Sequence, residues 1–207
     1  MPITFTLSYE GGLARRRQID FYDAAYALIG FQRSLAITTH FVINGTVITQ
    51  APSLKGAQIL ALPPEEGSWR LTAAIVLATV FAAPQNSVIG HLLTSAYDFV
   101  LSEALGFHID FNKTLGQQYE EVRKTRIPLD RQSENRFDSV IEKCQTAIRD
   151  MHRPIVASET AEAASLLAQV DREQTPLTPK LDRDSYEYMI FTVEDNYPTE
   201  VIGLISS

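Results

Sequence analysis

The sequence has 207 residues, of which 45% are apolar and 21% charged, so it excludes wholesale disorder and fits one domain, with or without a fragment of a second. A net charge of −7 is the opposite of what a nucleic-acid-binding protein needs, and we expect no nucleic-acid partner. The single cysteine excludes an internal disulfide and a cysteine zinc site, and it fits a reducing, cytoplasmic compartment.

One central stretch, residues 71–97, carries no formal charge. Its continuous apolar run is residues 71–83, which is shorter than the roughly 20 residues that a membrane helix requires, and the polar residues 84–87 follow directly. We therefore expect two buried elements here and no membrane association. The N-terminus also lacks the basic and apolar regions of a secretory signal.

The N-terminal half begins with an alternating, β-rich segment at residues 3–9, which predicts a strand. Asp20 stands where a helix N-cap belongs, and Asn44-Gly45 supplies a helix stop, so we expect a long helix over residues 21–42. Its apolar face has the spacing of a helix and comprises Phe21, Ala24, Leu28, Phe31, Leu35 and Val42.

Three short β segments follow in the sequence. They are residues 46–50, residues 57–62 and a third strand that starts near Ser68. Residues 71–83 mix β-branched residues with alanines, so strand and helix both remain open there. We expect a strand to about Ala74 and a helix from there to Ala83.

The second half reads mostly as helix. Ser87 is a candidate cap for a helix over residues 88–105, and Ser133 for a helix that Pro154 stops. Three further segments are assigned from shorter patterns: a brief strand at 107–111, a charged helix at 115–125 and an alanine-rich helix at 158–170.

These elements predict an α+β fold, with a small, mainly antiparallel sheet packed by a long helix, then a helical half and a C-terminal β hairpin. We expect an α+β domain over residues 1–174 and a proline-rich linker over 175–183. Residues 184–207 would form the hairpin, from strands at 185–193 and 200–207, or begin a truncated second domain.

No standard catalytic, nucleotide or metal motif is present, so we expect no catalytic residue, no cofactor and no metal site. Cys144 lies in register with the apolar face of its helix and is interpreted as core. The arginines at 15–17 are interpreted as solvated. One set of aromatic residues is interpreted as core between helix and sheet: Phe5, Tyr9, Phe21, Tyr22, Tyr26 and Phe31.

A candidate ligand pocket centres on His108 and Asp110, which share one side of an extended segment. Arg70 and His91 could contribute further polar groups, with Trp69 and Tyr97 as walls. This hypothesis requires the six side chains to converge on one concavity.

Three stretches carry a resemblance: residues 22–52, residues 63–69 and residues 89–115. They are similar to a family of uncharacterised bacterial proteins, a domain of unknown function often followed by a small β domain. The resemblance covers about residues 3–120 and implies a bacterial, cytosolic setting without any activity, cofactor or catalytic residue.

We therefore expect a non-enzymatic protein-interaction or self-association module, in which the charge-free stretch forms core or interface. One alternative is a small-ligand sensor or enzyme with an unrecognised pocket near His108 and Asp110. A second alternative is a membrane-active, defence-type effector that inserts residues 71–97 after a trigger.

Overall fold

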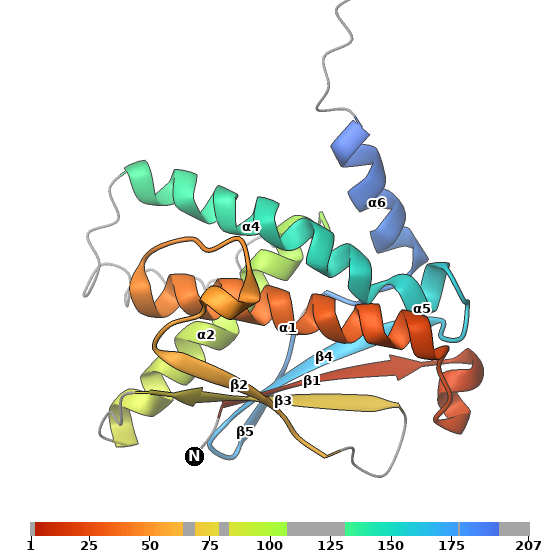
Figure 1. The fold of residues 1–207 in the computed structure, drawn as a ribbon, viewed down its shortest axis with the longest axis horizontal. Coiled ribbons are helices and arrows are strands. Elements are labelled where there is room, and N and C mark those ends of the chain that lie inside the picture. Colours follow the sequence, from red (N-terminus) through yellow and green to blue (C-terminus); the bar gives the residue numbers. More distant parts are fainter. Residues whose placement is uncertain (1–2, 64–68, 79–82, 107–130, 178, 195–207) are drawn as a thin grey trace, which may run out of the picture.

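The computed structural model describes residues 3–63, 69–78, 83–106, 131–177 and 179–194, with the backbone alone for 83–86, 131–136 and 191–194. Its centre is an antiparallel sheet of five strands in the order β2-β3-β1-β4-β5 (Figure 1). The strands are β1 Ile3–Glu10, β2 Ala57–Ala61, β3 Arg70–Leu77, β4 Ala163–Val170 and β5 Glu173–Pro176. The α-helices are α1 Phe21–Asn44, α2 Ala83–Ala104, α4 Arg131–Met151, α5 Arg153–Val156 and α6 Arg183–Glu194.

The predicted α+β class is confirmed, as are the antiparallel sheet and the long helix packed on it. Alternate residues of β1 are buried under the helices: Ile3, Phe5, Leu7 and Tyr9. Figure 1 shows α1, α2 and α4 together on one side of the sheet. On the opposite face, Thr6 of β1 and Thr72 of β3 lie side by side, with their hydroxyl oxygens 2.9 Å apart.

The long helix α1 begins and ends where its capping residues predict. The Asp20 carboxylate accepts a hydrogen bond from the Asp23 amide at 3.0 Å, which satisfies a first-turn donor. Gly45 adopts φ +66° and donates its amide to the Phe41 carbonyl, which closes the helix at Asn44.

Helices α1 and α4 approach each other closely at Gly30. A Cβ atom placed at this glycine would clash with the Ala147 carbonyl oxygen of α4. The apolar stripe of α4 faces the same interface, and its members are fully buried, as predicted: Val140, Cys144, Ala147, Ile148 and Met151.

The charge-free stretch contributes β3 and α2, and the described part of it is largely buried, as expected. The expected helix from Ala74 is wrong at its start, because Ile75 pairs with Ile3 of β1 and with Ile59 of β2, so the strand continues to Leu77. Ser87 lies inside α2 and does not cap it. Among the described residues, no helix combines the length and apolar character needed to cross a membrane.

The expected strand at residues 46–50 is also wrong. This segment is a loop tied to the side of α1, where Arg33 Nη2 donates to the Thr49 carbonyl at 3.3 Å. His40 Nε2 lies 3.0 Å from the Thr46 hydroxyl in the same loop. The loop therefore makes these polar contacts with side chains of α1, whereas a strand would make backbone hydrogen bonds to a neighbouring strand.

The expected alanine-rich helix at 158–170 is wrong, because its C-terminal part is the strand β4. Residues Thr4 to Glu10 of β1 pair with residues Gln169 to Ala163 in antiparallel register. The buried residues of β4 alternate, namely Ala164, Leu166, Ala168 and Val170, and this period of two matches a sheet covered on one face.

The structure also differs from the expected linker at residues 175–183 and from the expected strand at residues 185–193. Thr175 pairs with Ala168, and Leu181 forms a bridge with Ala164, so the segment from 175 continues the sheet. Residues 185–193 belong to the helix α6 rather than to a strand. The expected elements at 107–111, 115–125 and 200–207 lie outside the described residues.

Candidate functional site

A buried ion pair joins the first turn of α1 to the start of α5. The Asp23 side chain is 5% exposed, and its Oδ1 accepts hydrogen bonds from Arg153 Nε at 2.9 Å and Nη2 at 2.8 Å. Asp23 suits this place because a helix N-terminus favours negative charge. The pair fixes the Arg153 guanidinium over α1.

Two tyrosine rings stack against the other side of that guanidinium. The Arg153 Cζ atom lies 4.6 Å from the Tyr26 ring centroid and 5.3 Å from that of Tyr22, both within cation–π range. The ring centroids are 4.8 Å apart, and the two hydroxyl oxygens are 3.1 Å apart. The hydrogen bond to Tyr26 raises the pKa of Tyr22.

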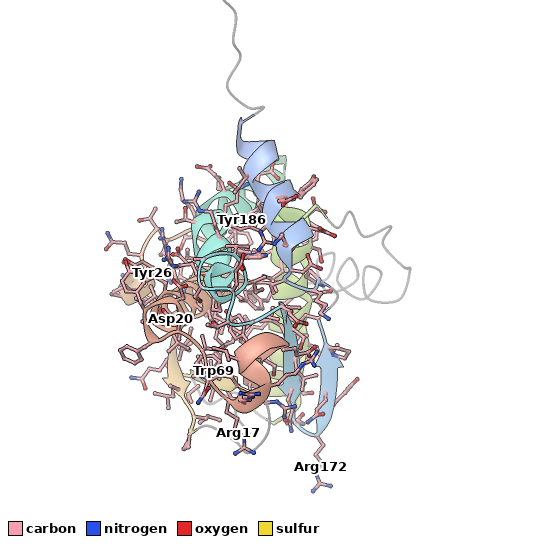
Figure 2. All side chains as sticks on the ribbon, turned by 90° about the vertical axis from the view of Figure 1, so that its right-hand side faces the viewer. Arg17, Asp20, Tyr26, Trp69, Arg172 and Tyr186 are labelled. Carbon is pink, nitrogen blue, oxygen red and sulfur yellow. The ribbon has the colours of Figure 1, made fainter. Side chains whose placement is uncertain are left out.

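Large apolar side chains at nearby positions of α1 are exposed. Phe21 is 89% exposed, and Tyr22 and Ile29 are each 59% exposed. We call Phe21, Tyr22, Tyr26, Ile29 and Arg153 the α1 aromatic surface. Figure 2 shows Tyr26 and Asp20 on the α1 side of the molecule, away from Arg172.

Charged side chains gather around Asp150, beside the α1 aromatic surface. Desolvation raises the pKa of Asp150, while the nearby Arg149, Arg153 and Arg33 guanidinium groups oppose this rise. Together with the Asp23 and Asp150 carboxylates, these three guanidinium groups give a net charge of +1, from three positive and two negative groups. Such an arrangement suits an acidic, apolar partner surface, because arginine and tyrosine are enriched among residues that dominate binding energy.

A second polar cluster, at the start of α6, is sealed from solvent. His152 Nε2 lies 3.0 Å from Ser185 Oγ, and His152 Nδ1 lies 2.9 Å from the Ile148 carbonyl oxygen. Nδ1 must carry the proton to donate to that carbonyl, so Nε2 is an acceptor, and the serine hydroxyl has two acceptors at 3.0 Å, Nε2 and the Asp182 carbonyl oxygen. Burial lowers the pKa of His152 to about 4, which keeps the ring neutral.

Ser185 also takes part in a reciprocal cap. Its amide donates to Asp182 Oδ1 at 2.9 Å, while the Asp182 amide donates to Ser185 Oγ at 2.9 Å. Although serine and histidine resemble a nucleophile with its base, Ser185 is 4% exposed and His152 fully buried. The cluster therefore fastens α6 to the end of α4 and offers no access to a substrate.

The described members of the predicted ligand pocket do not converge. Trp69 packs edge-on to Tyr9, with ring centroids 5.5 Å apart, and Arg70 pairs with Ser8. His91 is exposed, and its Nε2 atom lies 3.9 Å from Glu173 Oε2. The neighbouring residue Gly90 packs against Val170 and Ile3. Ile3 and Ser8 lie near opposite ends of β1, roughly 17 Å apart at the rise of a strand.

Tyr97, the sixth candidate, is a core residue. It is 1% exposed, its ring packs edge-on to Phe5, and its hydroxyl lies 2.8 Å from Ser34 Oγ. His108 and Asp110 lie outside the described residues, so a pocket around them stays a prediction. In the part of the chain that the structure describes, no group of three or more His, Cys, Asp or Glu side chains is arranged to hold a metal ion.

The interpretation of Cys144 as core is confirmed. The thiol is fully buried, and burial raises its pKa to about 12, so it is not a nucleophile at neutral pH. Arg15, Arg16 and Arg17 are exposed, as expected.

The interpretation of the aromatic residues as one core set is wrong for two of its members on α1. Phe5, Tyr9 and Phe31 are buried, but Phe21 and Tyr22 are exposed. Helical spacing holds a signal that could have separated them: at about 100° per residue, Tyr22 and Ile29 share a direction that differs by roughly half a turn from that of Phe31. The spacing alone could not reveal Arg153, which is 130 residues from Asp23.

No curated protein and no solved structure matches the chain. A family model described as a domain of unknown function, DUF7946, matches residues 5–190, which includes every strand and helix described above except the last four residues of α6 and the first two of β1. The chain therefore belongs to this uncharacterised family, DUF7946.

Proposed function

We propose that the protein is a non-enzymatic interaction module whose α1 aromatic surface docks an acidic, partly apolar surface of a protein partner. The observation that carries this proposal is the exposure of Phe21, Tyr22 and Ile29 on the helix α1, where a buried carboxylate holds the Arg153 guanidinium against Tyr22 and Tyr26. A surface that is ordered before binding loses less conformational entropy when the partner docks.

The charge pattern supports an acidic partner. The whole chain has a net charge of −7, yet Arg33, Arg149 and Arg153 outnumber Asp23 and Asp150 beside this surface, three positive groups against two negative ones. Complementary charge speeds association and suppresses wrong partners more than it raises affinity. We further propose a bacterial, cytoplasmic setting, which a lone, buried, reduced cysteine supports.

Two variants of the α1 aromatic surface test the proposal. Ile29→Glu removes an apolar contact and adds a charge that repels an acidic partner, and Tyr22→Ala removes one ring of the stack. Val88→Glu is the matched control, because Val88 on α2 is 43% exposed and lies outside the surface.

The bait is the intact protein in a lysate of its source organism, and each captured protein is purified and titrated against the bait. The proposal expects one binder whose affinity falls at least about tenfold with either α1 variant and is unchanged by Val88→Glu. Its association rate should fall as salt rises. Binders that ignore both α1 variants, or the lack of any direct binder, would overturn the proposal.

A further inference from the structure

The sheet ends on one side at β2, and hydrogen bonds define which residues face outward there. Leu62 donates its amide to the Thr72 carbonyl, and Ala78 donates to the Gly56 carbonyl, both at 2.8 Å. Antiparallel bonding alternates along a strand, so Gln58 and Leu60 turn their backbone groups toward β3. Ala57, Ile59 and Ala61 must then turn theirs away from the sheet.

This edge is covered at its first residue, Ala57, which is 8% exposed, but from Gln58 to Ala61 it carries few of the features that protect an edge strand. Residues 57–61 contain no charge and no proline, and in the described part of the chain no hydrogen bond from outside the sheet reaches the outward backbone groups. Leu60 is 47% exposed on the face opposite α1, α2 and α4, and Val76 of β3, its diagonal neighbour on that face, is 41% exposed. Uncharged edges of this kind accept another strand.

The residue pattern of β2 is complementary to itself. If two copies pair antiparallel about a two-fold axis through Ile59, Ile59 meets Ile59 of the second copy and Ala57 meets Ala61. On the open face, Gln58 meets Leu60. No like charges oppose each other, and the large central residue is flanked by small ones on both sides.

We infer that β2 pairs with β2 of a second copy of this chain, giving a symmetric dimer with one continuous sheet that has five strands from each copy. The three outward residues of each copy would exchange backbone hydrogen bonds, and Leu60 and Val76 of both copies would form one apolar row across the axis. A second copy is the occupant that this pattern favours, because antiparallel pairing about Ile59 places Ala57 against Ala61 and brings no like charges together. The dimer uses other residues than the α1 aromatic surface and does not depend on the proposed function.

Net charge adds an expectation about salt. Each copy carries −7, so two copies repel each other at long range, and screening weakens that repulsion. Because no ion pair holds the paired β2 strands, the dimer should become more stable as ionic strength rises. An interface held by ion pairs would show the opposite trend.

Sedimentation of the full chain over a concentration series tests the state of association. The wild type should change from monomer to dimer, with a dissociation constant that falls as salt is added. Leu60→Lys places two positive charges near the axis and should raise this constant at least about tenfold. Val88→Lys, at a similarly exposed position on α2, should leave it unchanged.

Disulfide formation tests the register directly. Gln58 and Leu60 of the two copies would be a directly opposed pair without mutual hydrogen bonds, where Cα atoms lie about 4.5 Å apart, within disulfide range. A mixture of Gln58→Cys and Leu60→Cys chains should therefore oxidise to the mixed dimer faster than either chain alone. Gln174→Cys, in the β5 strand at the opposite edge of the sheet, should not cross-link.

A strict monomer over the whole series would overturn the inference. So would a dimer that is insensitive to Leu60→Lys, or one that cross-links through Gln174→Cys. Circular dichroism checks that each variant is folded, and if Leu60→Lys does not fold, the cysteine mixture still decides the question. Because neither assay touches α1, failure here leaves the partner-docking proposal standing, and the reverse also holds.

Discussion

Arg153 carries two interactions at once, since one side of its guanidinium pairs with Asp23 and the other stacks on two tyrosine rings. Breaking a buried ion pair by removing one partner leaves an uncompensated charge, which is costly. Arg153 is the more exposed partner, with 33% of its side chain accessible, so water would recover part of this cost.

We expect Arg153→Ala to lower the free energy of unfolding by about 2 kcal/mol, measured by urea denaturation. Arg183→Ala is a suitable control. Arg183 contacts Glu159 at 2.7 Å, but the two side chains are 54% and 68% exposed, so we expect a loss below about 1 kcal/mol. Equal losses in both variants would show that Asp23 is not buried as described.

His152 makes stability depend on pH. Burial lowers its pKa to about 4 in the folded state, against about 6.5 when unfolded. Below pH 6.5 the unfolded chain binds the extra proton, so this contribution to stability is fully present above pH 6.5 and is lost as pH falls toward 4.

We expect the free energy of unfolding to be about 2 kcal/mol lower at pH 5 than at pH 7 because of this group. In His152→Gln most of the difference should disappear. A small part of it should persist, because burial also lowers the pKa of His40. His91→Gln, which changes an exposed histidine, should keep the full difference. A wild-type profile that is flat between these two pH values would contradict the burial of His152.

At the scale of elements, the contact between α1 and α4 depends on one glycine. Alanine is the better helix former by about 1 kcal/mol, so propensity alone would make Gly30→Ala stabilising. The added Cβ would meet the Ala147 carbonyl oxygen, a backbone atom that cannot move without shifting α4.

We expect the steric effect to dominate, with a net loss of about 2 kcal/mol in thermal or urea unfolding. Gln32→Ala, two residues away on the exposed side of α1, should be neutral or slightly stabilising. A stabilised Gly30→Ala variant would mean that the two helices are further apart than the structure has them.

Local signals predicted the elements whose own residues determine them. Asp20 and Gly45 bound α1, and the wide apolar stripe of α4 requires a helix. The prediction failed where contacts with a segment distant in the sequence determine the secondary structure. Residues 163–170 are rich in alanine, a helix former, but they have an alternating burial pattern and β1 supplies their hydrogen bonds.

The segment at 185–193 failed in the opposite direction. Its aromatic and β-branched residues favour a strand in isolation, yet Asp182 and Ser185 form a reciprocal cap that starts a helix. The α1 aromatic surface was missed for the same reason as β4, since Arg153 reaches Asp23 only through the tertiary fold. Sequence patterns indicate the local preference of a segment for helix or strand, and tertiary contacts determine which of the two forms.

For the whole molecule, the central strand β1 joins the two ends of the described chain. It pairs on one side with β3 and on the other with β4, which begins more than 150 residues later. The segment after β4 then adds β5 and returns to the sheet through Leu181. A linker outside the domain would tolerate substitution, whereas this segment should not.

Leu181→Ala distinguishes these two descriptions. Leu181 is fully buried and forms the bridge to Ala164, so truncation leaves a cavity that should cost about 3 kcal/mol of unfolding free energy. Lys180→Ala, one residue earlier, is the control: the Lys180 side chain is 55% exposed and lies 3.8 Å from Glu10, an ion pair worth less than about 1 kcal/mol. If Leu181→Ala were as mild as Lys180→Ala, the segment would be a linker after all, and the domain would end at β4.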